Sequence, residues 1–197
     1  MAKNRKEDER AFSFLPLNVR APKPRSRGIT EIRGPYYTPM GRRYLEDVLE
    51  TMGSYVDALK FAGGSFALMP RQVVRELIEL CHRHDVAVST GGFIERVLTY
   101  GRDAVDAYLR ECKELGFDIV EVSTGFITIP TDDWLRLVER VAKLGLKAKP
   151  EVGIQFGAGG ATTAAELAAE GTRDVGWAVE QAKRFLDAGA YMIMIES

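Results

Sequence analysis

Short β-rich runs alternate along the chain with longer segments in which apolar residues recur at helical spacing. A glycine or small-polar cluster separates most of these segments, and several helical patterns end in glycine, as helix C-termini often do. The strand-like runs cover residues 29–33, 56–61, 86–89, 119–123, 146–152 and 191–196. The helical patterns cover residues 42–52, 71–84, 104–116, 132–145 and 175–189. The repeating unit is therefore a strand followed by a helix.

Repeated strand–helix units of about 30 residues predict a parallel sheet, either doubly wound or closed into a barrel. No GxGxxG motif follows the first strand, and small-polar clusters follow several strands, as in barrels whose loops all feed one rim. We therefore predict an α/β fold of TIM type, a (β/α) barrel. A closed barrel usually needs about 250 residues. The sequence thus predicts a barrel truncated after its sixth strand.

Open strand edges have a physical consequence, because unpaired backbone groups invite association. An open, six-stranded sheet is expected to be poorly stable as a monomer or to form a homo-oligomer. The barrel domain is assigned to residues 28–197. Residues 1–27 are rich in Lys and Arg and contain three prolines, which predicts an N-terminal arm without regular structure. Its charges are expected to be solvated, although they could instead contact a phosphate or a partner subunit.

The composition fits one ordinary globular domain, with 46% hydrophobic and 28% charged residues in 197. The 27 basic and 28 acidic side chains nearly cancel, so nucleic acid is not an expected partner. Cys81 and Cys112 form neither a CxxC motif nor a disulfide framework. No hydrophobic stretch has the length of a membrane span or signal peptide, so neither a membrane partner nor export is expected. These features together predict a cytoplasmic protein.

Charged residues stand at the ends of several predicted strands. Glu121, Glu151 and Glu196 end three consecutive strands, and Lys60 and Lys149 lie near strand ends as well. Each of these charges, taken singly, could lie in solvent just beyond its strand. As a group they are more informative, because barrel active sites assemble from the carboxyl ends of several strands. Three carboxylates on neighbouring strands suit Mg²⁺, so we predict that Glu121, Glu151 and Glu196 bind this metal.

Glycine-rich turns follow four of the predicted strands, at residues 62–65, 89–92, 123–125 and 157–160. Such turns expose backbone N–H groups that can bind an anion, although a single glycine turn is weak evidence. Together they favour a small anionic ligand. The residues predicted to bind it are Arg33, Lys60, Ser65, Gly92 and Ser123.

Six segments together resemble the phosphosulfolactate synthase family. They are GITEIRGPYYT, VDALKFAGGS, the STGG turn, ECKELGFDIVEVSTG, KAKPEVG and LDAGAYMIMIE. The resemblance runs from about residue 28 to the end and is greatest to the branch that includes plant heat-stress-associated proteins. The archaeal branch implies a Mg²⁺-dependent carbon–sulfur lyase that adds sulfite to phosphoenolpyruvate on a TIM barrel. Two positions differ from the archaeal pattern: Ile154 replaces a lysine, and Glu31–Gly34 reads E-I-R-G.

Loss of a lysine at position 154 matters, because removing a positioned general acid typically costs a hundredfold or more. Lys149 shares a strand face with Glu151, so we predict Lys149 as proton donor and Glu151 as its catalytic partner. Another phosphorylated carboxylate could equally be the substrate. The alternative is a catalytically silent barrel that works as a stress-related binding protein. A nucleotide-dependent oxidoreductase lacks its sequence fingerprint.

Overall fold

The computed structural model describes residues 10–34, 41–127, 129–153 and 175–196, and these contain six strands joined by helices. The strands are β1 (Glu31–Arg33), β2 (Ala58–Lys60), β3 (Ala87–Ser89), β4 (Ile119–Val122), β5 (Lys147–Gly153) and β6 (Met194–Glu196). The α-helices are α1 (Arg42–Met52), α2 (Arg71–Arg83), α3 (Ile94–Leu98), α4 (Arg102–Leu115), α5 (Thr131–Lys143) and α7 (Val175–Asp187). Short 3₁₀ segments are η1 (Gly53–Tyr55), η2 (Ala62–Leu68) and η3 (Gly91–Phe93).

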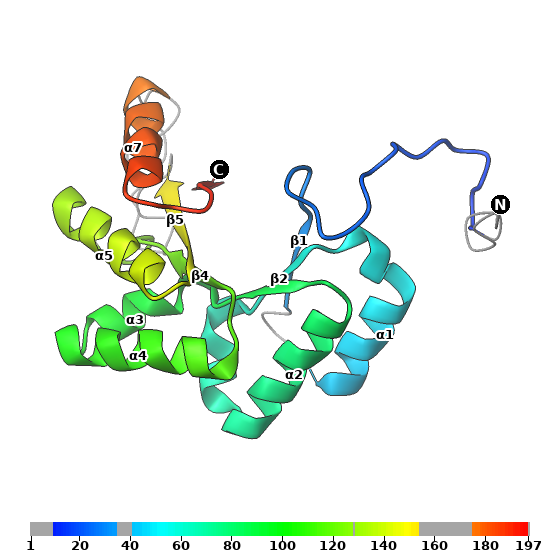
Figure 1. Ribbon diagram of the computed structural model, residues 1–197, viewed down its shortest axis with the longest axis horizontal. Coiled ribbons are helices and arrows are strands. Elements are labelled where there is room, and N and C mark those ends of the chain that lie inside the picture. The colour runs from blue at the N-terminus through cyan, green and yellow to red at the C-terminus, as the bar shows by residue number, and fades with distance from the viewer. Residues whose placement is uncertain (1–9, 35–40, 128, 154–174, 197) are drawn as a thin grey trace, which may run out of the picture.

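All six strands are parallel and follow one another in the sheet in the order of the sequence. A doubly wound sheet would reverse its strand order at a switch point, whereas a barrel adds each strand beside the last. The described strands therefore form half of a (β/α) barrel, as predicted. Figure 1 shows the helices on the outside of the curved sheet, with β1 and β5 on either side of its open part. Among the described residues, β1 and β6 are the outermost strands; association through their edges stays a prediction.

The five helical patterns correspond to α1, α2, α4, α5 and α7, but the turns after β2 and β3 are more structured than expected. They form η2, η3 and the short helix α3. Close packing explains one glycine in these turns: Gly91 has a φ of +60°, and a Cβ there would lie 2.4 Å from the carbonyl oxygen of Phe61. Only glycine fits such a position without displacing backbone. The turns after β2 and β3 are therefore packed elements rather than open loops.

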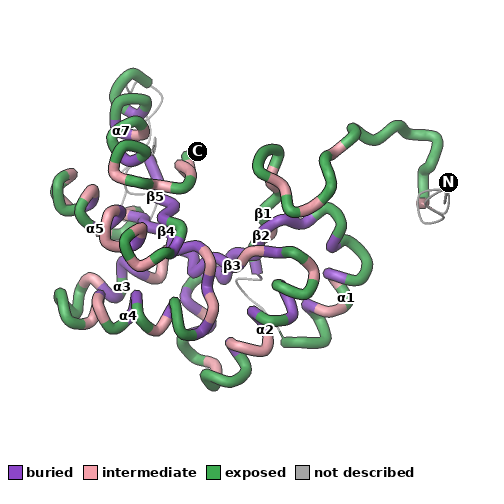
Figure 2. The backbone as a smooth tube through the Cα atoms, in the orientation of Figure 1, coloured by how far each residue is buried: buried purple, intermediate pink, exposed green. Residues whose placement is uncertain are grey.

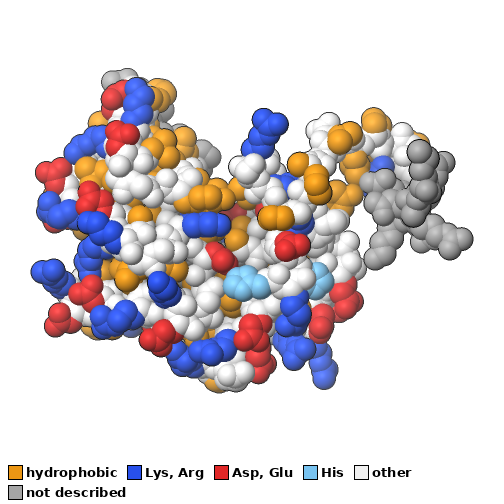
Figure 3. Space-filling model, viewed as in Figure 1, with side chains coloured by type: hydrophobic (Ala, Val, Ile, Leu, Met, Phe, Trp, Pro, Cys, Tyr) orange, Lys and Arg blue, Asp and Glu red, His pale blue; other side chains and the backbone are white. Residues whose placement is uncertain are grey.

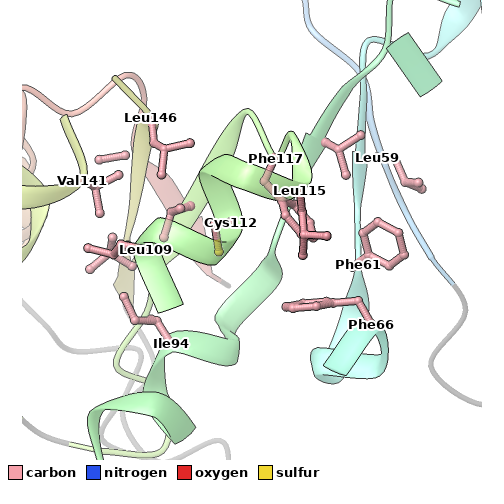
Figure 4. Close-up of a cluster of buried hydrophobic side chains, with 14 of the residues drawn as sticks. Leu59, Phe61, Phe66, Ile94, Leu109, Cys112, Leu115, Phe117, Val141 and Leu146 are labelled. Atoms are coloured by element: carbon pink, nitrogen blue, oxygen red, sulfur yellow. The ribbon is translucent and has the colours of Figure 1, made fainter. Parts of the chain in front are cut away.

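The hydrophobic core lies between the sheet and the helices, and Figure 2 shows buried residues following the strands and the inner sides of the helices. Side chains alternate along β4, so Val120 and Val122 enter this core while Glu121 points to the other face. Phe66 packs against Phe61 and Phe117, with ring centroids 5.8 and 5.1 Å apart (Figure 4). No helix in the described ranges is long and apolar enough to cross a membrane.

The described part of the N-terminal arm contains no helix or strand, but three of its basic side chains are not simply solvated. Arg20 and Arg25 form ion pairs with Asp57, at 3.0 and 2.7 Å. Lys23 donates to the carbonyl oxygens of Gly53 and His84. These partners lie just before β2 and β3, so the arm is attached to the amino-terminal end of the sheet. The expectation of a solvated arm is therefore wrong for these three side chains. The sequence did not reveal their partners, because these lie 30 or more residues away along the chain.

Asp57 is the centre of this attachment. Burial by itself would raise the pKa of Asp57, but the N–H of Thr30 and the guanidinium groups of Arg25 and Arg20 outweigh it and hold the pKa below its ordinary value. A carboxyl whose pKa is lowered by folding stabilises the fold above its unfolded pKa, near 4, and loses that contribution as the pH falls through its folded pKa.

We therefore predict that Asp57→Asn lowers the free energy of unfolding at pH 7 by about 1–3 kcal/mol. The difference from wild type should begin to shrink below about pH 4, where the carboxyl of the unfolded chain takes up a proton, and should disappear once the pH falls below the lower pKa of the native carboxyl. Urea unfolding at several pH values measures both effects. Asp47→Asn, on the exposed side of α1, is the control and should change little. A difference that persists undiminished at pH 2 would contradict the proposed role of the charge.

Candidate functional site

Four charged side chains of alternating sign meet on the concave face of the sheet. Lys60 Nζ lies 2.8 Å from Glu121 Oε1, and Lys149 Nζ lies 3.3 Å from Glu121 Oε2. Lys149 Nζ also donates to both carboxylate oxygens of Glu31, at 2.7 and 2.8 Å. We call Glu31, Lys60, Glu121 and Lys149 the interior charge cluster. It joins β1, β2, β4 and β5 across the open face of the half-barrel.

Strand register explains why these residues meet. Side chains that are partners in a parallel register point to the same face, and Glu121 is the register partner of Lys149. Arg33 is likewise the register partner of Lys60 on the neighbouring strand. Lys60 stands between Leu59 and Phe61, whose side chains enter the hydrophobic core on the other face. The alternation that places these two residues in the core therefore directs Lys60 into the interior.

Three members of the cluster are deeply buried, which makes their pairing obligatory. Glu121 and Lys149 are each 2% exposed and Lys60 is 8% exposed. An unpaired charge at such a depth would cost several kcal/mol. Glu121 Oε2 lies within ion-pair distance of Lys149 but accepts no hydrogen bond, because Lys149 directs its protons to Glu31. Glu121 thus keeps one buried oxygen with unused hydrogen-bonding capacity.

Two of the three predicted metal ligands, Glu121 and Glu151, can be placed in the structure. Within the described ranges, no group of three acidic, histidine or cysteine side chains is placed to hold a metal. Glu121 faces two ammonium groups, which compete with a cation for its oxygens. Glu151 is buried near the end of β5, and Glu196 ends β6, but the side chain of Glu196 lies outside the described residues. Glu121 therefore fits a partner of the lysines better than a metal ligand.

The other predicted substrate-binding residues lie on the turns at the carboxyl ends of the strands. Ser65 is in η2 and is partly buried. Gly92 and Ser123 lie together: a Cβ on Gly92 would be 2.6 Å from Ser123 Oγ. Ser123 donates its proton to Glu95 Oε1 at 2.6 Å. The 157–160 turn and Ile154 lie outside the described residues.

Two acidic residues that the sequence did not single out are important in this arrangement. Glu31 accepts both short hydrogen bonds from Lys149, from a strand 118 positions away in the sequence. Glu95 is a buried carboxylate of α3 that binds the turn after β4. The alternation of β1 did place Glu31 and Arg33 on one face. For Glu95, the available signal was its position directly after the glycine turn 91–92.

A cavity of about 510 Å³ opens on the same concave face, but toward the amino-terminal ends of the strands. Figure 3 shows this side of the molecule, where hydrophobic and charged side chains together border a hollow. Its lining includes Arg25, Asp57 and Asp118 together with Glu31 and Lys149 of the interior charge cluster. This cavity thus lies at the opposite end from the rim on which barrel enzymes carry their chemistry. The interior charge cluster lies between the two.

Comparison with known proteins shows the family to which this chain is related. The sequence model of the (2R)-phospho-3-sulfolactate synthase (ComA) family matches residues 18–197. Protein HEAT-STRESS-ASSOCIATED 32 of Arabidopsis thaliana is 37% identical over 195 residues, covering 94% of this chain and 68% of that protein. The phosphosulfolactate synthase of Methanothermobacter thermautotrophicus is 34% identical over 143 residues, covering 73% of this chain and 54% of that enzyme. The chain thus spans little more than half the length of the archaeal relative.

A solved structure supports the fold independently. A protein of Burkholderia cenocepacia J2315, assigned as a phosphonomutase, superposes with a TM-score of 0.51 over 85% of this chain and 69% of its own. The two sequences are 13% identical, so the likeness concerns the fold alone.

The interior charge cluster leads to a stability prediction. Glu121→Gln should lower the free energy of unfolding by about 3–5 kcal/mol, because it leaves Lys60 and Lys149 buried without their shared partner. Glu139→Gln removes a carboxylate from an exposed pair with Lys143 and should cost no more than about 1 kcal/mol. Urea unfolding of both variants measures the difference. Equal stabilities would show that the cluster does not form in solution.

Proposed function

This chain belongs to the phosphosulfolactate synthase family, and from that premise we propose that it acts as a lyase-type enzyme on a small phosphorylated carboxylate. The proposed reaction is the addition of sulfite to phosphoenolpyruvate. The observation that carries the proposal is the interior charge cluster, in which Lys60 and Lys149 are buried on the concave face beside two carboxylates. Buried lysines on barrel strands are costly to keep, which favours a catalytic or binding role for them.

Binding of the substrate would use the positive charges on β1 and β2. Lys60 and Arg33 are register partners on adjacent strands, so their charges enter the same region of the face. The phosphate and carboxylate of phosphoenolpyruvate are both anions that ammonium and guanidinium groups bind well. Lys60 donates one proton to Met194 Sδ, a weak acceptor 3.6 Å away. An anionic oxygen in place of this sulfur would accept a stronger hydrogen bond.

The proposed chemistry requires a proton donor. The lone pair of sulfite attacks the methylene carbon of phosphoenolpyruvate, and the electrons of the C=C bond move toward the central carbon and the carboxylate. A proton from the ammonium of Lys149 then forms the new C–H bond at the central carbon, which leaves Lys149 neutral until solvent reprotonates it. Glu31 and Glu121 fix the position of this ammonium through their contacts.

We propose that the metal of this reaction is Mg²⁺ bound by Glu151, with Glu196 as a further ligand, while Glu121 pairs with the lysines. Carboxylate oxygens are the ligands that Mg²⁺ prefers. When bound, the ion would stabilise negative charge on the substrate carboxylate.

The second candidate function is a catalytically silent barrel that acts in stress-related binding. It is favoured by the identity of 37% to the plant heat-stress-associated protein, which exceeds the 34% identity to the archaeal enzyme. Binding and activity measurements on the full natural chain distinguish the two candidates.

Calorimetry tests the binding site. The full chain should bind phosphoenolpyruvate in the presence of Mg²⁺. Lys60→Ala should lower the affinity for this anion at least tenfold, because it removes a buried positive charge. Glu151→Gln should lower the affinity for Mg²⁺, whereas the control Glu139→Gln should leave it nearly unchanged. Unchanged affinities in the two site variants would favour the silent barrel.

Activity tests the proton donor. Lys149→Met should reduce kcat/KM for sulfite addition at least about a hundredfold, because a positioned general acid contributes that much or more. Lys147→Met, an exposed lysine two residues earlier on β5, is the matched control and should stay within about threefold of wild type. Thermal melts confirm that both variants are folded. Retention of full activity by folded Lys149→Met would exclude Lys149 as the donor.

A further inference from the structure

Glu95 is a buried carboxylate that the reaction proposed above does not use. It lies on α3, is 6% exposed and is enclosed by the turn that follows β4. Its Oε1 accepts a hydrogen bond from Ser123 Oγ at 2.6 Å. Its Oε2 accepts from the backbone N–H groups of Phe126 and Ile127, at 2.6 and 3.3 Å. Three neutral donors from residues 123–127 thus converge on one carboxylate.

This set of donors is typical of an anion-binding turn. Consecutive backbone N–H groups and a serine hydroxyl are the groups with which proteins bind phosphate and other oxyanions without a positive side chain. Hydrogen bonds to an ionised acceptor are short, and two of the three here are 2.6 Å long. The turn therefore binds an anion already, and that anion is a side chain of the protein.

The donors have no further protons to offer a ligand. A serine hydroxyl has one proton, and Ser123 gives it to Glu95. The N–H groups of Phe126 and Ile127 are likewise used. The space is closed as well, since a Cβ on Gly92 would meet Ser123 Oγ at 2.6 Å and Glu95 Oε1 at 3.5 Å. A substrate phosphate at this turn would have to displace the carboxylate.

We propose that the turn of residues 123–127 is an anion-binding site whose resident ligand is the Glu95 carboxylate. Occupation by Glu95 excludes phosphate or sulfonate groups from this turn. Such groups would then bind near Lys60 and Lys149 on the concave face. Ser123 then supports the site without touching the substrate. The inference rests on the contacts of Glu95 and does not depend on the reaction proposed above.

The proposal predicts that removing the carboxylate makes the turn a site for a small external anion. Glu95→Ala leaves three buried donors unsatisfied, which should lower the melting temperature by several degrees. Formate, which has the shape of the missing carboxylate, should restore part of that loss with a saturable dependence on its concentration. Chloride at equal ionic strength should restore much less.

Thermal melts with sodium formate test this directly, with wild type and Glu79→Ala as matched controls. Glu79 is an exposed glutamate on α2, so its variant carries the same charge change. The expected result is a gain in melting temperature for Glu95→Ala at least twice that of either control, abolished in Glu95→Ala/Ser123→Ala. Equal gains in all variants would overturn the proposal.

A second measurement serves even if Glu95→Ala does not fold. The amide resonances of Phe126 and Ile127 are followed by NMR while inorganic phosphate is added to wild type and to Glu95→Ser. We expect both resonances to stay constant in wild type and to shift saturably in Glu95→Ser, whose short side chain leaves the donors of the turn unoccupied. Saturable shifts in wild type would show that the donors are open while Glu95 is present. Constant resonances in folded Glu95→Ser would show that the turn does not bind anions. Either result overturns the proposal.

Discussion

A charge taken out of water must be paired, and this requirement determines how the concave face of the sheet is organised. Lys60, Glu121, Lys149 and Glu31 satisfy it as a chain of alternating sign in which each internal member contacts two partners. Because the four residues come from β2, β4, β5 and β1, the chain fixes the relative positions of strands that are not all neighbours. The same contacts that stabilise the half-barrel place two ammonium groups where a ligand could use them.

Both ends of the sheet follow the same rule with different chemistry. At the amino-terminal end, Asp57 is a buried carboxylate that two arginines of the arm neutralise. At the carboxyl end, Glu95 is satisfied by a hydroxyl and two backbone N–H groups. The two arginines neutralise Asp57 and attach the N-terminal arm to the sheet. The donors to Glu95 are neutral, so they satisfy its oxygens without cancelling its negative charge.

Periodicity in the sequence was sufficient to predict the fold and the direction of most site residues. The strand–helix repeat located six strands, and alternation placed Glu121 and Lys149 on their shared face. What it could not predict was the identity of the partners. Lys149 binds Glu31 across 118 positions, and Arg25 binds Asp57 across 32, distances over which no local pattern carries information. The glycine turns after β2, β3 and β4 are where the sequence predicted them, but the donors of the turn after β4 are occupied by Glu95. The sequence could not predict this, because burial of a carboxylate depends on tertiary contacts.

The two carboxylates that hold Lys149 are not equivalent, and the difference bears on how an anion could reach it. Glu121 is 2% exposed and lies between both lysines, so moving it would leave the buried Lys60 without a carboxylate partner and Lys149 with Glu31 alone. The side chain of Glu31 is 26% exposed, lies on the outermost strand β1 and lines the cavity. Its charge can be returned to water at lower cost than that of Glu121. An anionic ligand that competes for Lys149 would therefore displace Glu31, while Glu121 continues to hold both lysines in position.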